Sequence, residues 1–303
     1  MSKSNLLRVK IYGARGSYSS TDNKATEVGV NTTCLRVDVG KNIIIFDAGS
    51  GIINCGKDLA KEFHTERSSQ NKWKTHLFFT HMHMDHLCGF PFFAMLYMPK
   101  SLIHLISPRI LDVTLEEALN RFMHPPLFPV GINDLPFEGH FHEFAEKYIA
   151  YFYEDDFKIK LAINAAEDGW LAKISCIRNY MHPKGGSFFY KIETPAGHKF
   201  VFASDTEGFV GGDHRLINFA KDADVLLHDA QYIPEQYPMF QGFGHSTYEM
   251  ACEVAEKAGV KKLVLVHHDP NHDDSVLKEI EQNAAKIFPN TVLGCEGMEF
   301  EFD

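Results

Sequence analysis

Apolar positions along the chain form two patterns, short runs of β-branched or aromatic residues and longer amphipathic segments. The short runs are bounded by turns that contain Gly or Asp, which is typical of strands. A first group of strands is predicted at about 6–13, 33–39, 42–48 and 76–80. A second group is predicted at about 172–178, 187–194, 199–204, 224–228 and 262–267, closed by short strands near 291–294 and 297–302.

The amphipathic segments predict helices at about 51–63, 112–123, 246–259 and 274–287. Ser246 and Thr247 are suited to cap the third helix, and His272, Asp273 and Asp274 fit the charged N-terminus of the fourth. Strands and helices therefore alternate, and two sheets with outer helices fit this order. No repeat or linker divides the chain, so residues 1–303 are predicted to form a single domain.

The stretch at about 100–170 is the least regular part of the pattern and is predicted to be an irregular insert in that domain. Its aromatic residues are interleaved with acids, whereas a nucleic-acid stacking surface would add basic residues. Packing on the core or on a partner subunit is therefore the preferred interpretation. Three histidines of the stretch are expected to be solvated loop residues: His124, His140 and His142.

Composition indicates the cellular compartment of the protein and the kinds of partner that it can bind. The six cysteines are scattered without a C-x-x-C pair, so no disulfide framework is expected. The apolar run at the start is too short for a signal peptide, and no segment has about eighteen apolar residues for a membrane span. A cytoplasmic protein without a membrane partner is predicted. The net charge of −10 would repel a polyanion, which disfavours long nucleic acids.

The segment THMHMDHLCGF at 80–90 carries the strongest chemical signal. Where a strand ends and turns into a helix, His81 and His83 can point the same way, while the turn directs Asp85 and His86 to a second point nearby. Imidazole and carboxylate ligands together suit Zn²⁺, Mn²⁺ or Fe²⁺. A divalent metal site is therefore predicted here.

These four residues match H-x-H-x-D-H, and on them the chain resembles the metallo-β-lactamase superfamily. Further segments resemble the subgroup that contains the phosphoribosyl cyclic phosphodiesterases and ribonuclease Z. In order they are GARGS (13–17), NTTC (31–34), FDAGSG (46–51), DHLCGFPFF (85–93), HPKGGSFFYKIE (182–193), ASDTEG (203–208), HDAQY (228–232), GHST (244–247) and LVLVHHDP (263–270). The resemblance implies the α/β class and a four-layer αββα fold, with two packed mixed sheets between outer helices.

The resemblance also implies two divalent metal ions, Zn²⁺ first and Mn²⁺ or Fe²⁺ as alternatives, which share a hydroxide nucleophile. The ligands of the first metal would be His81, His83 and His182. Those of the second would be Asp85, His86 and His267, with Asp205 bridging both ions. His268 is an alternative to His267, which is preferred because the family's histidine directly follows the strand residue held here by Val266.

Two further residues are implied to act in catalysis beside the ligand Asp85. By resemblance to the ribonuclease Z branch, His245 is a general acid or phosphate contact. Asp229 would orient it and hold the imidazolium form. A buried pair with only a structural role is the alternative, and His228 is expected to be structural. The glycine-containing segments GARGS and DAGSG match no phosphate loop and are expected to be scaffolding.

The preferred function is a binuclear phosphodiesterase on a small substrate, such as a cyclic nucleotide or cyclic sugar phosphate. Only 22 residues separate His182 from Asp205, which leaves room for a hairpin but for no tRNA-holding arm. The Cys pattern of the phosphoribosyl enzymes' structural zinc is also missing. The alternatives are an RNA-processing endonuclease of ribonuclease Z type, a lactone or thioester hydrolase, and a non-catalytic metal-binding protein. The resemblance further implies a homodimer.

Overall fold

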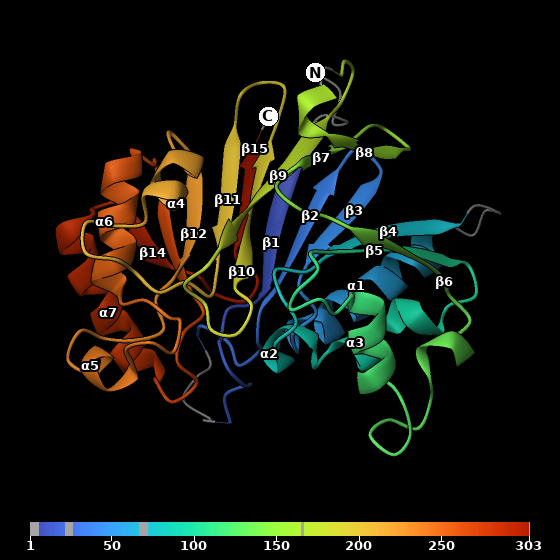
Figure 1. Ribbon diagram of the computed structural model, residues 1–303, viewed down its shortest axis with the longest axis horizontal. Coiled ribbons are helices and arrows are strands. Elements are labelled where there is room, and N and C mark those ends of the chain that lie inside the picture. The colour runs from blue at the N-terminus through green and yellow to red at the C-terminus, as the bar shows by residue number, and fades with distance from the viewer. Residues whose placement is uncertain (1–5, 22–26, 67–71, 165–166, 303) are drawn as a thin grey trace.

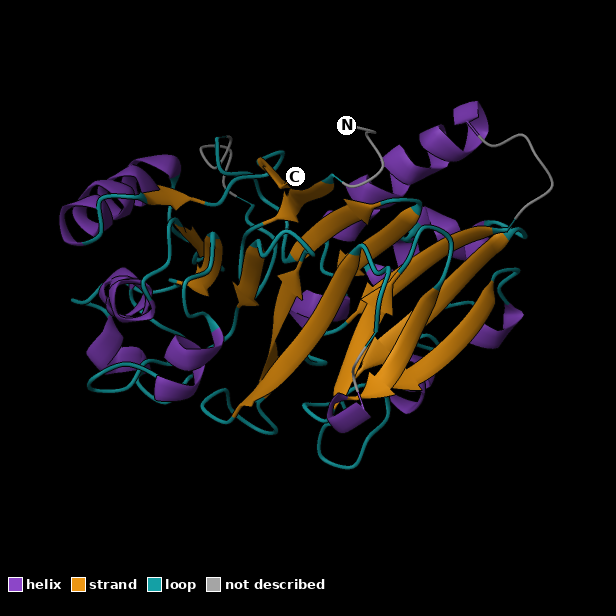
Figure 2. Ribbon diagram, turned by 90° about the horizontal axis from the view of Figure 1, so that it is seen from above, coloured by secondary structure: helices purple, strands orange, loops and turns teal. Residues whose placement is uncertain are grey.

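The computed structural model describes residues 6–21, 27–66, 72–164 and 167–302. Within these residues two β-sheets pack face to face, and helices cover their outer sides (Figure 1). The view from above shows helices on both flanks of the strands (Figure 2). The prediction that the chain has no signal peptide rests in part on residues 1–5. These residues lie outside the part of the chain that the structure describes. In the described part, no helix has the length and apolar character needed to cross a bilayer.

The first sheet has the strand order β15-β1-β2-β3-β4-β5-β6. Strands β15, β1, β2 and β3 pair antiparallel, and β3 to β6 pair parallel, so the sheet is mixed. The bounds are β1 Leu7–Gly13, β2 Cys34–Val39, β3 Asn42–Phe46, β4 Trp73–Phe78, β5 Ser101–Ser107, β6 Glu138–Glu143 and β15 Glu299–Phe302.

The second sheet has the order β14-β13-β12-β11-β10-β9-β7-β8. Strands β11 to β14 pair parallel and the remaining neighbours pair antiparallel. The bounds are β7 Tyr148–Phe152, β8 Phe157–Leu161, β9 Ala172–Asn179, β10 Ser187–Glu193, β11 Lys199–Ala203, β12 Val225–Asp229, β13 Leu263–Val266 and β14 Thr291–Leu293.

Three apolar clusters separate the four layers. The first lies between the sheets and joins Phe46 and Phe78 of one to Tyr190 and Phe202 of the other. The second packs the first sheet against α1 and α3, and the third packs the second sheet against α4, α6 and α7. The helices are α1 Gly51–Glu66, α2 Met84–Leu87, α3 Leu115–Phe122, α4 His214–Phe219, α5 Tyr237–Phe240, α6 Tyr248–Ala258 and α7 Asp274–Ile287. The predicted αββα layering of two mixed sheets is therefore confirmed.

The helix starts follow the predicted capping chemistry. Thr247 precedes α6, and its hydroxyl accepts a hydrogen bond from the Met250 N–H. Asp273 caps α7 by accepting from the N–H groups of Ser275 and Val276. The helix predicted from 112 begins later, after Thr114, because this residue forms a capping box that defines the first turn.

The stretch at 100–170 is not the irregular insert that the sequence pattern predicts. It supplies β5 and β6 to the first sheet and β7 and β8 to the second, with α3 between them. Phe144 and Phe152 pack between the sheets, as the core-packing interpretation of the aromatic residues requires. Residues 165–166 of the stretch lie outside the described part.

The last strand also differs from its predicted place. The strand near 297–302 is predicted to close the second group, yet β15 pairs antiparallel with β1 in the first sheet. The chain crosses between the sheets after β14, and Phe302 packs in the cluster between them, where it contacts Phe200. A period-two pattern identifies a strand but does not choose its partner.

Histidines from three parallel strands lie side by side toward the β6 edge of the first sheet. His76 of β4 pairs in register with His104 of β5, which pairs with His140 of β6. The Nδ1 of His104 lies 3.0 Å from the Nε2 of His142. His140 and His142 therefore belong to a strand, which corrects their prediction as loop residues, whereas His124 is an exposed loop residue as predicted.

We expect His76 to make the fold sensitive to mild acid. Burial, together with the charge of His104, lowers the pKa of His76 to about 3 from the ordinary value of 6.5. The unfolded chain therefore binds more protons below about pH 6.5, and the stabilising contribution of neutral His76 is lost as the pH falls toward 3. His76→Phe should reduce the loss of unfolding free energy between pH 7 and 5 by about 2 kcal/mol.

Urea denaturation of the metal-loaded protein at both pH values measures this difference. His214→Phe is the matched control, because it replaces an exposed imidazole on α4 and should keep the pH dependence of the wild type. Equal losses of stability in wild type and His76→Phe would show that burial of this ring does not cause the acid sensitivity.

Candidate metal centre

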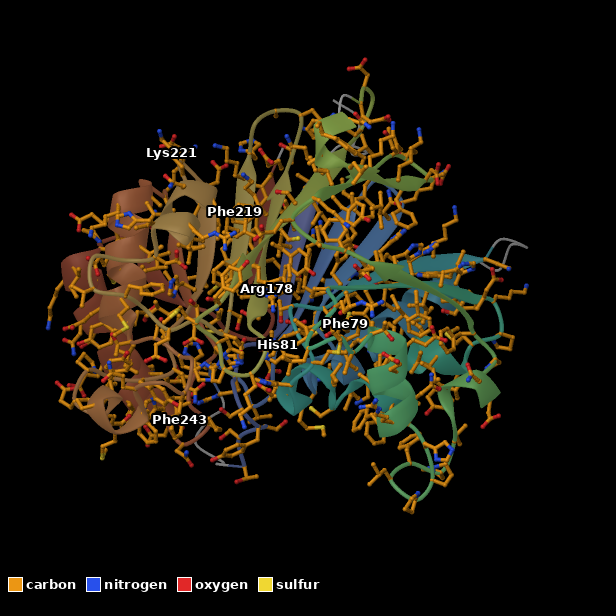
Figure 3. The ribbon with its side chains drawn as sticks, in the orientation of Figure 1. Phe79, His81, Arg178, Phe219, Lys221 and Phe243 are labelled. Carbon is orange, nitrogen blue, oxygen red and sulfur yellow. The ribbon has the colours of Figure 1, made fainter. Side chains whose placement is uncertain are left out.

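The predicted ligands meet at the edge where strands of both sheets end. His81 and His83 follow β4, Asp205 follows β11, and His267 follows β13. Because β11, β12 and β13 are parallel, their carboxyl ends lie at one edge, which is where α/β sheets place their ligand sites. His81 and Phe79 lie near the middle of the molecule, where the two sheets come together (Figure 3).

Three residues of this edge have left-handed backbone conformations that non-glycine residues rarely adopt. The φ angles are 62° at Asp47, 56° at Asp205 and 61° at His267. Such conformations cost of the order of 1 kcal/mol each and are retained where the surrounding structure imposes them, as it does at functional sites. The backbone strain therefore coincides with the candidate centre.

The predicted ligand atoms form two adjoining groups. One comprises His81, His83 and His182, and the Nδ1 of His83 lies 2.8 Å from the Nε2 of His182. The other comprises Asp85, His86, Asp205 and His267. Within each group the ligand atoms all lie within 4.8 Å of one another.

Asp205 lies between the two groups. Its Oδ1 is 3.7 Å from the Nε2 of His81 and 3.1 Å from the Nε2 of His267. Its Oδ2 is 3.2 Å from the Nε2 of His86. This carboxylate therefore occupies the position that a bridging ligand requires.

The ambiguity between His267 and His268 has a geometric answer. The Nε2 of His267 is 3.2 Å from the Oδ2 of Asp85 and faces the second group. The Nε2 of His268 instead donates to the carbonyl oxygen of Gly294 at 3.0 Å. The structure thus brings His267 to the centre and turns His268 away from it.

The outer nitrogens of four ligand rings are hydrogen-bonded. The Nδ1 of His86 donates to Asp47 at 2.8 Å, and the Nδ1 of His267 donates to the side-chain oxygen of Gln231 at 2.9 Å. The Nδ1 of His81 donates to the Thr80 hydroxyl oxygen at 3.0 Å, and the Nδ1 of His182 donates to the Gly244 carbonyl at 3.1 Å. Each bond fixes the tautomer and directs Nε2 into the centre, as around metal-binding histidines.

Two of the inward nitrogens test whether the residues fit a metal ion. The Nε2 atoms of His81 and His86 are buried and have no hydrogen-bond partner among the described residues. Buried polar atoms are rarely left unpartnered, and the carboxylates of Asp85 and Asp205 face the same space. Burial alone would raise the pKa of Asp205, but the neighbouring imidazoles hold it well below its ordinary value. Two ionised carboxylates among imidazole nitrogens fit divalent cations.

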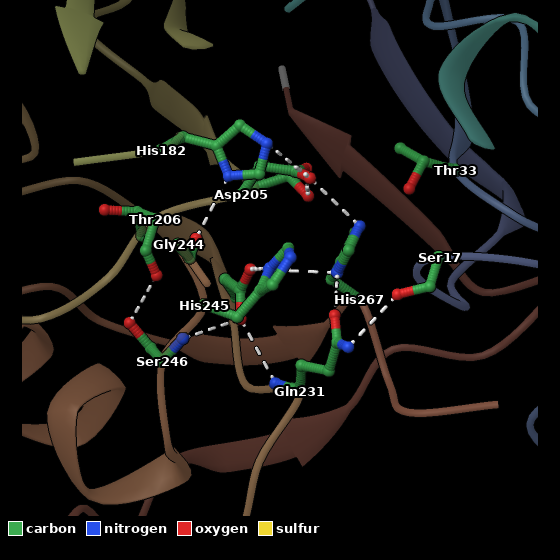
Figure 4. A network of polar contacts seen from close by, with 12 residues as sticks. Ser17, Thr33, His182, Asp205, Thr206, Gln231, Gly244, His245, Ser246 and His267 are labelled. Atoms are coloured by element: carbon green, nitrogen blue, oxygen red, sulfur yellow. Dashed lines mark hydrogen bonds and ion pairs between the residues drawn. The ribbon is translucent and has the colours of Figure 1, made fainter. Parts of the chain in front are cut away.

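His245 and Asp229 lie beside these groups as a hydrogen-bonded pair. The Nδ1 of His245 donates to the Oδ2 of Asp229 at 2.7 Å, and Asp229 Oδ1 accepts from the Ser246 N–H at 3.1 Å. Burial raises the pKa of Asp229, but the adjacent His245 outweighs it and lowers the pKa. The ring of His245 stacks on His267 at a centroid distance of 4.8 Å (Figure 4). The pair therefore adjoins the second ligand group, whereas His228 is buried and bonds to the Asp229 carbonyl.

The segments expected to be scaffolding include residues that touch the ligands. Asp47 belongs to DAGSG, and the Ser17 N–H of GARGS donates to Asp85 at 2.9 Å. A Cβ on Gly16 would lie 2.1 Å from the Nδ1 of His267, so this glycine allows the backbone to approach the ring. The available signal for Asp47 is a carboxylate placed directly after the apolar strand NIIIF.

Removal of the Asp47 charge should weaken metal binding without unfolding the site. Asp47→Asn loses the charged partner of His86, and loss of such outer partners costs about 10–100-fold in metal affinity. Chelator competition measures the change for each bound ion. Asp155→Asn, an exposed carboxylate that pairs with Lys41, is the control and should bind metal as the wild type does. Unchanged affinity in Asp47→Asn would contradict the role of Asp47.

Residues 44–268 match the profile of the beta-lactamase superfamily domain. The chain belongs to the beta-lactamase superfamily. A curated ribonuclease Z from Pyrococcus horikoshii is 25% identical and aligns over 87% of this chain and 88% of its own. The predicted family is therefore confirmed, and with it the hydrolase class.

Solved structures of low sequence identity share the fold. A diphosphatase of the PhnP family has a TM-score of 0.64 at 14% identity and covers 98% of each chain. The short form of human tRNase Z has a TM-score of 0.62 at 20% identity, over 97% of this chain and 98% of its own. The fold of this superfamily implies divalent metal ions at the candidate centre.

Proposed function

We propose that this chain is a binuclear metal-dependent phosphodiesterase. The observation that carries the proposal is the position of Asp205, whose carboxylate faces His81 of the first ligand group and both His86 and His267 of the second. A first ion would be held by His81, His83 and His182. A second would be held by Asp85, His86 and His267, with Asp205 shared. When bound, such ions polarise phosphoryl oxygens and generate a nucleophile from water. Zinc suits this donor set, and manganese or iron are the alternatives.

The residues around the ions have separate tasks. Asp85, with its pKa held well below the ordinary value by His86 and His267 against the effect of burial, remains an ionised ligand. His245, oriented through its Nδ1 by Asp229, presents its Nε2 for proton transfer to the leaving alkoxide. Asp229 accepts the Nδ1–H hydrogen bond of His245 and so fixes the orientation of the ring.

A small substrate, such as a cyclic nucleotide or cyclic sugar phosphate, is the preferred class. The residues between His182 and Asp205 form the β10–β11 hairpin and add no arm that would hold a folded RNA. The net charge of −10 also disfavours a polyanion. We further propose a reducing, cytoplasmic setting, which all six cysteines, free in the structure, support.

Processing of RNA is the second candidate, because the curated relative named ribonuclease Z aligns over most of both chains. It differs from the first candidate in the size of the substrate and not in the metal chemistry. A precursor tRNA included among the substrates therefore separates the two.

The proposal is tested with metal-loaded enzyme on cyclic and linear phosphodiesters, a precursor tRNA, a lactone and a thioester. Cleavage of small phosphodiesters at higher kcat/KM than the other substrates is expected. Preferred cleavage of the precursor tRNA would support the second candidate. If the phosphodiesters remain intact while the lactone or thioester is opened, the enzyme is a carboxylic ester hydrolase and the proposal is wrong.

A further inference from the structure

Glu207 is a buried carboxylate outside the predicted ligand set, and only 5% of its surface is exposed. Its Oε1 accepts hydrogen bonds from the Tyr237 hydroxyl at 2.6 Å and from the Gly242 N–H at 2.7 Å. Its Oε2 accepts from the Gly244 N–H at 3.0 Å. The donors lie on α5 and the turn that follows it, so one side chain holds this segment at three points.

The turn held by Glu207 leads directly into His245. Its Gly244 has a φ of 91°, and a Cβ there would lie 2.6 Å from the Nδ1 of His182. The carbonyl of the same glycine accepts a hydrogen bond from that nitrogen. Gly244 is therefore fixed on one side by a predicted metal ligand and on the other by Glu207.

The segment that carries Glu207 also reaches the residue after His245. Glu207 is two positions beyond Asp205, and the carbonyl of Thr206 between them accepts from the Ser246 hydroxyl at 2.6 Å. The bonds from His182 to Gly244 and from Ser246 to Thr206 flank His245 in Figure 4. Residues 205–207 thus connect the candidate bridging carboxylate to Gly244 and Ser246, the two neighbours of His245.

The chemistry of the side chain explains why a carboxylate is required. A carboxylate has only acceptors and about four lone-pair sites, so it satisfies three donors at once. A carboxamide of the same shape would direct an N–H₂ group at one of these donors. Hydrogen bonds to a charged acceptor are also about twice as strong as those between neutral groups.

We propose that Glu207 is a positioning residue that holds the turn of Gly242 and Gly244 so that His245 is aligned with the leaving group. The inference rests on the proposed role of His245 as general acid. Glu207 does not touch the reacting atoms. Because Gly244 also accepts from His182, unchanged metal content in a Glu207 variant is the readout that assigns the effect to His245. Removal of Glu207 should therefore reproduce, in weaker form, the kinetic pattern of a missing general acid.

The leaving group distinguishes that pattern from general damage. A p-nitrophenolate departs without protonation, whereas an alkoxide needs the acid. With an alkyl phosphodiester, Glu207→Gln should lower kcat by about tenfold or more, since about 1.4 kcal/mol corresponds to tenfold. With bis(p-nitrophenyl) phosphate the loss should be below about threefold. KM and metal content should match those of the wild type.

Two variants accompany this measurement. Tyr237→Phe removes one of the three donors and leaves the carboxylate in place. We therefore expect a smaller loss of kcat with the same dependence on the leaving group. This variant also tests the proposal if Glu207→Gln does not fold. Glu249→Gln is the matched control, because it neutralises an exposed carboxylate that lines the same cleft as Glu207. It should behave as the wild type.

A double-mutant cycle completes the test. In a His245→Ala background, Glu207→Gln should cause no further loss with the alkyl substrate. An independent, additive loss, or equal losses with both leaving groups in Glu207→Gln and Tyr237→Phe, would overturn the positioning role while leaving the proposed function intact. If His245→Ala itself shows no dependence on the leaving group, the general-acid assignment fails, and the inference about Glu207 fails with it.

Discussion

Asp205→Asn should lose both bound metal and turnover. Asp205 is the residue whose oxygens face both ligand groups, so its neutralisation removes a charged ligand from each predicted ion. We expect kcat for bis(p-nitrophenyl) phosphate to fall by at least about a thousandfold, because charge stabilisation by the ions is lost. Mass spectrometry should show that the metal content per chain also falls.

Asp222→Asn is the matched control for this substitution. Asp222 shares the left-handed backbone of Asp205, with φ of 55° against 56°, but lies in an exposed turn. Asparagine tolerates this conformation as aspartate does, so neither substitution adds backbone strain. The control should retain metal and activity. Full activity in Asp205→Asn would exclude a bridging role for this carboxylate.

His245→Ala should retain both metals and still lose rate. His245 lies close enough to His182 and Asp205 to form a further group of possible ligand atoms, but it is outside the two main groups and its Nδ1 is bonded to Asp229, so we expect the ions to remain without it. General acid catalysis contributes about 10²–10⁴-fold, and a loss in this range is expected for an alkyl phosphodiester. The loss for bis(p-nitrophenyl) phosphate should be under about tenfold, because its leaving group needs no proton.

Metal analysis of the same variant separates the two possible roles of this histidine. Loss of an ion in His245→Ala would show that it is a ligand. Retention of both ions together with equal losses for good and poor leaving groups would assign it to phosphate contact instead of proton transfer.

The local part of the centre was accessible from sequence, and the distant part was accessible only by resemblance. His81, His83, Asp85 and His86 lie within six residues, so strand and turn geometry alone predict that they converge. No periodicity relates them to Asp205 or His267, which reach the site because parallel strands end at a common edge. Only the family motif predicts those positions from the sequence.

The outer hydrogen bonds were beyond sequence reasoning. Gln231, Thr80 and Glu207 are ordinary polar residues in the sequence, and each has a partner on another strand or turn: His267, Asp47 and Gly244. Their roles depend on side-chain directions that the sheet register fixes. Asp47 offered the strongest local signal of this kind, a carboxylate at the end of a fully buried strand.

The wrong predictions about strands have a related cause. Strand β6 has the sequence EGHFHE, in which polar residues dominate, so no hydrophobic pattern marks it at the edge of the sheet. Its pairing with β5 aligns histidines that look like loop residues in the sequence. For β15 the pattern was sufficient to find the strand but not to choose between two sheets.

The central claim is a binuclear metal centre that cleaves phosphodiesters, and metal content combined with chelation tests it most directly. Purified protein is analysed by mass spectrometry, and hydrolysis of bis(p-nitrophenyl) phosphate is followed before chelation, after chelation and after metal is restored. We predict two divalent ions per chain and cleavage that disappears with the metal and returns with it. Two firmly bound ions without cleavage, or cleavage that survives complete removal of metal, would contradict the claim.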